Sequence, residues 1–89
     1  MPKTRKLVLD VLKPHQPNAL DFATTLANLR PDYQVKLTVT EVDKKTESTI
    51  VTIEGQDILF NEIKATIEQM GASVHSIDQV EVSGSEVSD

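Results

Sequence analysis

The chain has 89 residues, a formal net charge of −5 and no cysteine. Its length suits a single domain, because a second one would have too few residues for a core of its own. The lack of cysteine excludes disulfides, zinc–cysteine sites and thiol catalysis, and fits a reducing compartment. No apolar run approaches the roughly 20 residues that span a membrane, so we expect a cytoplasmic protein without a membrane partner.

The acidic balance also argues against a nucleic-acid partner. Binding to phosphates needs a surplus of basic residues, whereas 9 Lys and Arg stand here against 14 Asp and Glu. The aromatic residues Phe22, Tyr33 and Phe60 offer little material for stacking bases. We therefore expect no nucleic acid among the partners.

The first third of the chain predicts a strand followed by a helix. Residues 5–13 are rich in Leu and Val and too few for a typical core helix, and Pro14 and Pro17 follow them. One strand face would carry the core residues Leu7, Leu9 and Val11. Asn18 is a good N-cap for the helix, and Pro31 ends it. Its apolar stripe at helical spacing consists of Ala19, Phe22, Ala23, Leu26 and Leu29.

The middle of the chain switches to the two-residue period of strands. Residues 33–43 alternate apolar and polar side chains, residues 43–47 form a polar turn, and a second alternating stretch places Val51 and Ile53 inward. These two strands should pair as a hairpin.

A second helix, a last strand and a tail complete the chain. Asp57 is the expected N-cap of the helix and Gly71 its left-handed stop. The last strand covers residues 73–82, and its register stays open because either choice of face turns His75 or Asp78 inward. Residues 1–82 would form the domain and residues 83–89 a disordered acidic tail. The buried helix face consists of Phe60, Ile63, Ile67 and Met70.

The element order β-α-β-β-α-β is that of the ferredoxin-like α+β fold. Right-handed crossovers then place both helices on one face of a four-stranded antiparallel sheet. The other face has no helix to cover it. It could be an ordinary solvated surface, or its aliphatic residues could form an interface. We favour self-association, with the interface residues Val8, Leu12, Val42 and Ile50.

Two groups of polar residues could carry chemistry. Antiparallel pairing of the first and last strands would bring Asp10, His15, His75 and Asp78 near one another, although histidines that hydrogen-bond locally are the more ordinary outcome. Around the hairpin turn, Glu41, Asp43 and Glu47 supply carboxylates that calcium or magnesium could use. Their spacing matches no metal-binding loop, and a charged turn is the simpler interpretation.

Sequence motifs of known catalytic sites are missing. The chain has no glycine-rich phosphate loop, no Gly-x-Ser-x-Gly elbow and no His-Glu-x-x-His. In the loop after the first strand, Pro14 and Pro17 remove backbone donors that a phosphate cradle would need. The pattern therefore favours a protein that is not an enzyme.

Several segments resemble one archaeal family. The long block Leu7-Val8-Leu9-Asp10-Val11-Leu12-Lys13-Pro14-His15 is the most specific, and three shorter blocks support it: Glu41-Val42-Asp43, Thr52-Ile53-Glu54-Gly55 and His75-Ser76-Ile77-Asp78. Together they are similar to domain of unknown function 211, whereas residues 30–33 fit its pattern less well. The resemblance implies a ferredoxin-like fold and ring-like homo-oligomers, and it implies no activity.

Two functional hypotheses follow. The first is a non-enzymatic homo-oligomeric module that binds a small ligand or a divalent cation between subunits. The second is a small enzyme or metal site that uses the cluster of Asp10, His15, His75 and Asp78, in which a carboxylate beside a histidine could act as an acid/base pair.

Overall fold

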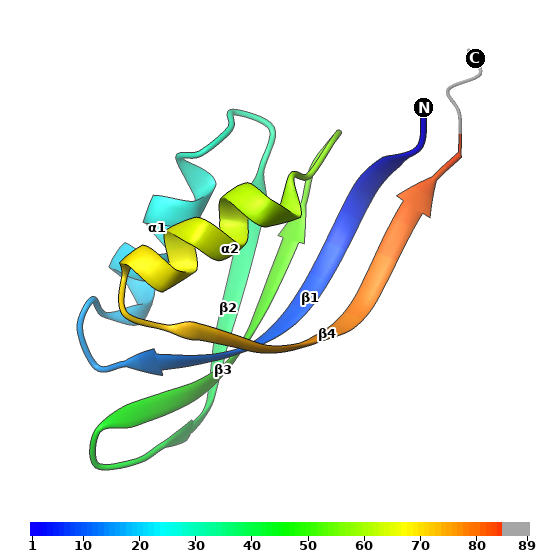
Figure 1. Ribbon diagram of the computed structural model, residues 1–89. Helices are drawn as coiled ribbons and strands as arrows, with labels where there is room; N and C mark the ends of the chain where they lie inside the picture. Colours follow the sequence, from blue (N-terminus) through cyan, green and yellow to red (C-terminus); the bar gives the residue numbers. More distant parts are fainter. Residues whose placement is uncertain (85–89) are drawn as a thin grey trace.

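The computed structural model describes residues 1–84 and has the predicted element order (Figure 1). The elements are β1 (Lys3–Pro14), α1 (Ala19–Ala27), β2 (Gln34–Val42), β3 (Thr46–Glu54), α2 (Phe60–Gln69) and β4 (Ser73–Ser83). Every strand pair is antiparallel, the strand order is β2-β3-β1-β4, and both helices lie on one face of the sheet. The ferredoxin-like α+β fold is thereby confirmed. The predicted tail lies outside the described residues, except that Ser83 closes β4 and Gly84 follows it.

The hydrophobic core lies between the two helices and the central strands β1 and β3. Leu9 and Val11 have no exposed surface, and neither do Val51 and Ile53, so the inward faces of both strands are those that the alternation predicts. Each aliphatic side chain buried in this way contributes roughly 1.5–3 kcal/mol. The fully buried helix residues that meet them are Phe22, Leu26, Ile63 and Ile67.

The helix boundaries agree with the sequence in part. The Asn18 side chain caps α1 by accepting a hydrogen bond from the Asp21 amide at 2.8 Å, as predicted. Gly71 follows α2 with φ +85°, the left-handed conformation expected of it. The predicted cap Asp57 is wrong, because α2 begins at Phe60. Ile58 is buried and its amide donates to Thr4 of β1, which keeps this segment in a loop.

Two irregularities in β4 settle its register. Val74, Ile77 and Val80 pair with Val11, Leu9 and Leu7, and therefore lie on the helix-covered side. Strict alternation cannot place residues three apart on one side. The ladder shifts once beside His75 and once beside Asp78, so each shift takes up an extra residue as a β-bulge does. Neither choice of a regular register, which the sequence left open, describes this strand.

The molecule is elongated, with extents of 49 × 22 × 18 Å. A helix rises about 1.5 Å per residue and a strand about 3.3 Å. The helices α1, with 9 residues, and α2, with 10, are therefore much shorter than the strands β1, with 12, and β4, with 11. In Figure 1, β1 and β4 extend past the helices at one end of the sheet, and the β2–β3 hairpin extends past them at the other. Both ends leave part of the helix-side face uncovered.

Candidate functional site

The side chain of His15 meets the β2–β3 hairpin. His15 lies in the loop between β1 and α1, and its Nδ1 is 2.9 Å from Oε2 of Glu47 in β3. Its Nε2 is 2.9 Å from the carbonyl oxygen of Lys44 in the hairpin turn. The ring thus connects the end of the first strand to the hairpin through both of its nitrogens.

Lys13 completes this group from inside the protein. Its side chain has no exposed surface, although lysine is rarely buried unless it is paired. Its Nζ donates to Oε1 of Glu47 and to the carbonyl oxygen of Pro14, both at 2.9 Å, and lies 5.9 Å from the centre of the Phe22 ring. Glu47 therefore has a side-chain nitrogen at each carboxylate oxygen, that of Lys13 at Oε1 and that of His15 at Oε2. We call these three residues the Lys13–Glu47–His15 cluster.

The cluster stabilises the charged forms of His15 and Glu47. The hydrogen bond to Glu47, and then the one to the Lys44 carbonyl, raise the pKa of His15 above its ordinary value. Both partners are acceptors only, so a doubly protonated ring, which donates from both nitrogens, satisfies them best. The hydrogen bonds from His15 and then Lys13 lower the pKa of Glu47. In this arrangement each polar group already has a protein partner, so its clearest role is to join two segments of the fold.

The predicted group of Asp10, His15, His75 and Asp78 is not assembled in this form. Asp10 lies on β1 between Ile50 and Ser76, and the Asp78 carboxylate accepts a hydrogen bond from Ser76 at 2.6 Å. The side chain of His75 is exposed at an irregular position of β4. Within residues 1–84 no hydrogen bond joins His15 to any of the other three.

The acidic residues of the hairpin likewise do not form one group. Glu47 is engaged by Lys13 and His15, whereas Glu41 and Asp43 are exposed. The backbone amide of Asp43 donates to the Thr46 carbonyl at 2.8 Å and closes the turn. In the described part of the chain, no three His, Asp or Glu residues stand where they could jointly hold a metal ion. Calcium or magnesium binding stays a prediction.

The four predicted interface residues divide between the two faces of the sheet. Val8 and Leu12 of β1 lie with Ile50 of β3 on the helix-free face, as expected. Val42 does not, because β2 takes up an extra residue at Thr40, after which Val42 pairs with Glu47 on the helix side. Leu12 is 42% exposed and Val42 65% exposed, while Val8 and Ile50 are partly buried. Whether these residues form an interface stays a prediction.

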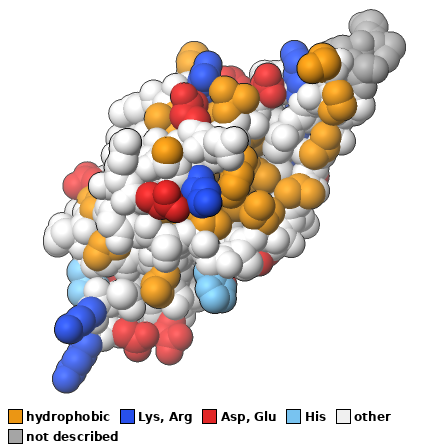
Figure 2. All heavy atoms as spheres, in the orientation of Figure 1, with side chains coloured by type: hydrophobic (Ala, Val, Ile, Leu, Met, Phe, Trp, Pro, Cys, Tyr) orange, Lys and Arg blue, Asp and Glu red, His pale blue; other side chains and the backbone are white. Residues whose placement is uncertain are grey.

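Sequence reasoning missed a row of exposed aliphatic residues on β4. Ile77 is 48% exposed, Val80 53% and Val82 58%. We call these three residues the β4 apolar row. In Figure 2, hydrophobic side chains gather beside α2 and continue toward the projecting end of β1 and β4. The three-residue spacing of Val74, Ile77 and Val80 is the sequence signal of this row, but it can be interpreted only once the bulges of the strand are known.

Fold and site together define a small ferredoxin-like α+β domain with a polar cluster near one end and an exposed aliphatic row on an edge strand. Within the described residues, no helix is long and apolar enough to cross a membrane. Residues 5–89 match the model of the family described as "Uncharacterized ArCR", domain of unknown function 211. The chain belongs to this family, so the resemblance in the sequence is confirmed.

A curated archaeal relative supports the same assignment. The chain is 49% identical over 76 residues to an uncharacterized protein of Methanocaldococcus jannaschii. The match covers 85% of this chain and 78% of that protein. Neither the family description nor the name of the relative states a function.

Proposed function

We propose that this protein is a non-enzymatic homo-oligomeric module that assembles through the edges of its sheet. The observation that carries the proposal is the β4 apolar row, because three aliphatic side chains about half exposed on one edge strand are unusual for a monomer of this size. An edge strand also presents unpaired backbone groups that another strand can bind. The charged residues that commonly protect such an edge are limited on β4 to Asp78 and Glu81.

A second copy of the chain is the best match for this edge. The other edge strand, β2, carries exposed Val39 and Val42, and their ladder partners Thr49 and Glu47 place them on the helix-side face too. Pairing β4 of one copy with β2 of the next would therefore extend the sheet and bring aliphatic residues of the same face together. Such a head-to-tail contact forms a ring when its rotation closes. It agrees with the ring-like assembly that family resemblance implies.

Light scattering during size-exclusion chromatography tests the proposal on the full chain. We expect the wild-type protein to elute as an oligomer at micromolar concentration and Val80→Lys to shift it toward the monomer, since a buried unpaired ammonium opposes the contact. Leu20→Lys is the matched control, because Leu20 is 74% exposed on α1 and belongs to neither edge strand. Leu12→Lys examines the helix-free face in the same way.

The outcomes separate the surfaces. Dissociation by Val80→Lys, with Leu20→Lys unchanged, supports assembly through β4, and an additional effect of Val42→Lys supports the head-to-tail form. Dissociation by Leu12→Lys alone would move the interface to the helix-free face and overturn the assignment to β4. A wild-type protein that is strictly monomeric at about 100 μM, a concentration at which even weak specific dimers form, would overturn self-assembly itself.

A further inference from the structure

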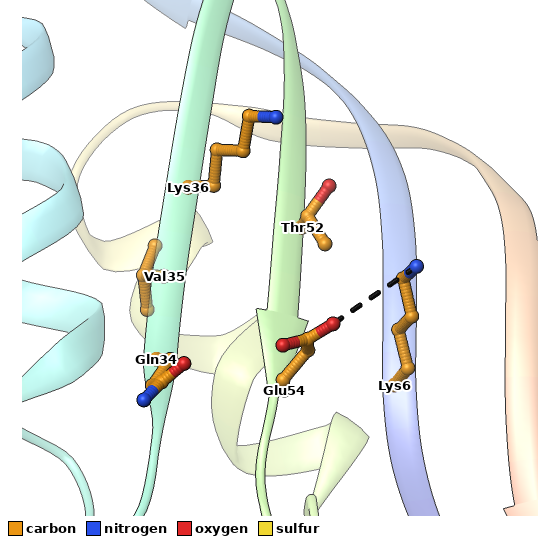
Figure 3. A pocket seen from close by; sticks show the side chains of 6 residues that line it. All are labelled: Lys6, Gln34, Val35, Lys36, Thr52 and Glu54. Atoms are coloured by element: carbon orange, nitrogen blue, oxygen red, sulfur yellow. Dashed lines mark ion pairs between the residues drawn. The ribbon is translucent and has the colours of Figure 1, made fainter.

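The helix-free face carries a hollow of about 360 Å³ over three adjacent strands (Figure 3). Its volume lies at the lower end of the range found for small-molecule sites, about 300–1,000 Å³. The register of the sheet builds it. Gln34, Glu54 and Lys6 form one cross-strand row, and Lys36 and Thr52 belong to the next row on the same face. The lining residues are Lys6, Gln34, Val35, Lys36, Thr52 and Glu54.

The two lysines of the hollow are weakly compensated. In Figure 3 the Lys36 side chain extends from β2 toward β3, and its ammonium has neither a hydrogen bond nor an ion pair within residues 1–84. Lys6 faces Glu54 with 4.0 Å between Nζ and Oε2, the outer limit of an ion pair, and Glu81 is its ladder neighbour on the other side. Because an exposed pair of this length contributes little, Lys6 can turn to a ligand at small cost.

The chemistry of the lining is rich in donors. Both ammonium groups donate, the Thr52 hydroxyl and the Gln34 amide can donate, and Glu54 is the single carboxylate. Ammonium groups bind carboxylates and phosphates through charge-assisted hydrogen bonds. In a chain of net charge −5, two lysines in one hollow stand out as an anion-binding arrangement.

We propose that this hollow binds a small anionic metabolite. Its carboxylate or phosphate group lies between Lys6 and Lys36, beside Thr52, and an amino or hydroxyl group on the same molecule contacts Glu54. Lys36 is the main anchor because its ammonium forms no ion pair within residues 1–84, whereas Lys6 faces Glu54. The proposal adds a ligand to the assembly described above. The hollow shares β2 with the proposed head-to-tail contact, but it lies on the helix-free face, whereas the aliphatic residues of that contact lie on the helix side.

Amide NMR titration of the full chain tests the site. The probes are O-phosphoserine, malate and inorganic phosphate, so the phosphate and carboxylate sources are examined separately. We expect saturable shifts at the amides of Lys36, Thr52 and Glu54 with O-phosphoserine or malate. Lys36→Gln should weaken that binding about tenfold or more, because it removes a charge-assisted hydrogen bond. Lys64→Gln is the matched control, as Lys64 is exposed on α2.

Two comparisons complete the design. O-phosphoserine should bind more tightly than inorganic phosphate to the wild-type protein, and Glu54→Gln should remove this preference. Repeating the titration on Val80→Lys shows whether binding survives without assembly, so failure of one proposal is distinguishable from failure of the other. Absence of saturable shifts at these amides, an equal loss of affinity in Lys64→Gln, or equal affinity for the two phosphates in the wild type would overturn the proposed site.

Discussion

Lys13 lies inside the protein because each part of its side chain finds a suitable neighbour. Its methylene groups are buried with the core, and its ammonium meets Glu47, the Pro14 carbonyl and the face of the Phe22 ring. Removing one partner of a buried ion pair leaves a charge without compensation, which costs far more than an exposed pair contributes. The second partner of Glu47, His15, belongs to the one residue type whose charge ordinarily changes near neutral pH.

His15 should make the stability of the protein depend on pH. Its pKa is raised in the folded state, so its contribution is fully present below its unfolded pKa, about 6.5, and is lost as pH rises through the folded value. The pKa of Glu47 is lowered, so the contribution of Glu47 is present above its ordinary pKa and is lost as pH falls through the folded value. Thermal unfolding between pH 4 and 9 should show greatest stability between those two ordinary values.

The variant His15→Gln isolates this effect. Glutamine can still hydrogen-bond but does not titrate, so the decline of melting temperature above about pH 6.5 should flatten. His75→Gln is the matched control, because His75 is exposed on β4 and belongs to no ion pair in the described chain. If both variants keep the wild-type pH profile, the His15–Glu47 contact does not stabilise the folded state in solution.

At the scale of elements, the start of α2 depends on the side chain of Tyr33, which lies just before β2. The Leu59 amide, at the N-cap position, donates to the Tyr33 hydroxyl at 3.0 Å, and no side chain of the helix itself caps this end. Asp32 next to it accepts from the Gln56 amide at 2.7 Å. Gly55 lies between these contacts, since an added Cβ would be 3.0 Å from atoms of Asp32 and Tyr33. Residues 32 and 33 thus position the loop that leads into the helix.

Tyr33→Phe should lower the free energy of unfolding by about 1 kcal/mol, the usual net value of one hydrogen bond. The ring stays buried, so only the acceptor for the Leu59 amide is lost. Urea denaturation followed by circular dichroism measures the change, and the m-value should stay the same. Phe60→Tyr adds a hydroxyl elsewhere and controls for the chemistry of the ring. A stability equal to that of the wild type would mean that water replaces the tyrosine cap.

The elements show where sequence reasoning succeeds and where it fails. Regular strands and caps are local features, so the inward faces of β1 and β3 and the Asn18 cap could be predicted. The prediction of the α2 start is wrong because Ile58 and Leu59 are held by hydrogen bonds to Thr4 and Tyr33, which are far away in the sequence. The bulges in β2 and β4 could not be predicted for the same reason. An extra residue at Thr40 or beside His75 is fixed by the partner strand, so the local sequence does not locate it until the pairing is known.

The candidate site repeats this lesson for side chains. The sequence singles out both His15 and Glu47 but assigns them to different groups, whereas the structure brings them into contact. Their meeting depends on how the loop after β1 faces the hairpin turn, which antiparallel strand pairing alone does not specify. Lys13 lies in the predicted strand and alternation puts it on the inward face, but the sequence does not show the distant carboxylate, Glu47, that allows a lysine to be buried there.

At the scale of the whole molecule, short helices on a long sheet leave the domain with an incomplete core. Small domains bury a modest fraction of their surface and often gain stability from self-association. The β4 apolar row is surface of this kind: each Å² of it removed from water by a partner contributes about 25 cal/mol. Assembly would therefore be part of the folding energetics and not only a functional state.

This coupling predicts a melting temperature that rises with protein concentration. For an oligomer that unfolds to single chains, a tenfold increase in concentration stabilises each subunit by about 0.7–1.4 kcal/mol, depending on the number of subunits, by mass action. For a domain of this size that shift amounts to several degrees. Differential scanning calorimetry from about 5 to about 500 μM spans concentrations at which micromolar affinities are expressed. Val80→Lys should melt at one temperature throughout, whereas Leu20→Lys should follow the wild type. A wild-type melting temperature that does not change with concentration would show that assembly does not stabilise the fold. The core between the helices and the sheet would then be sufficient for the stability of a single chain.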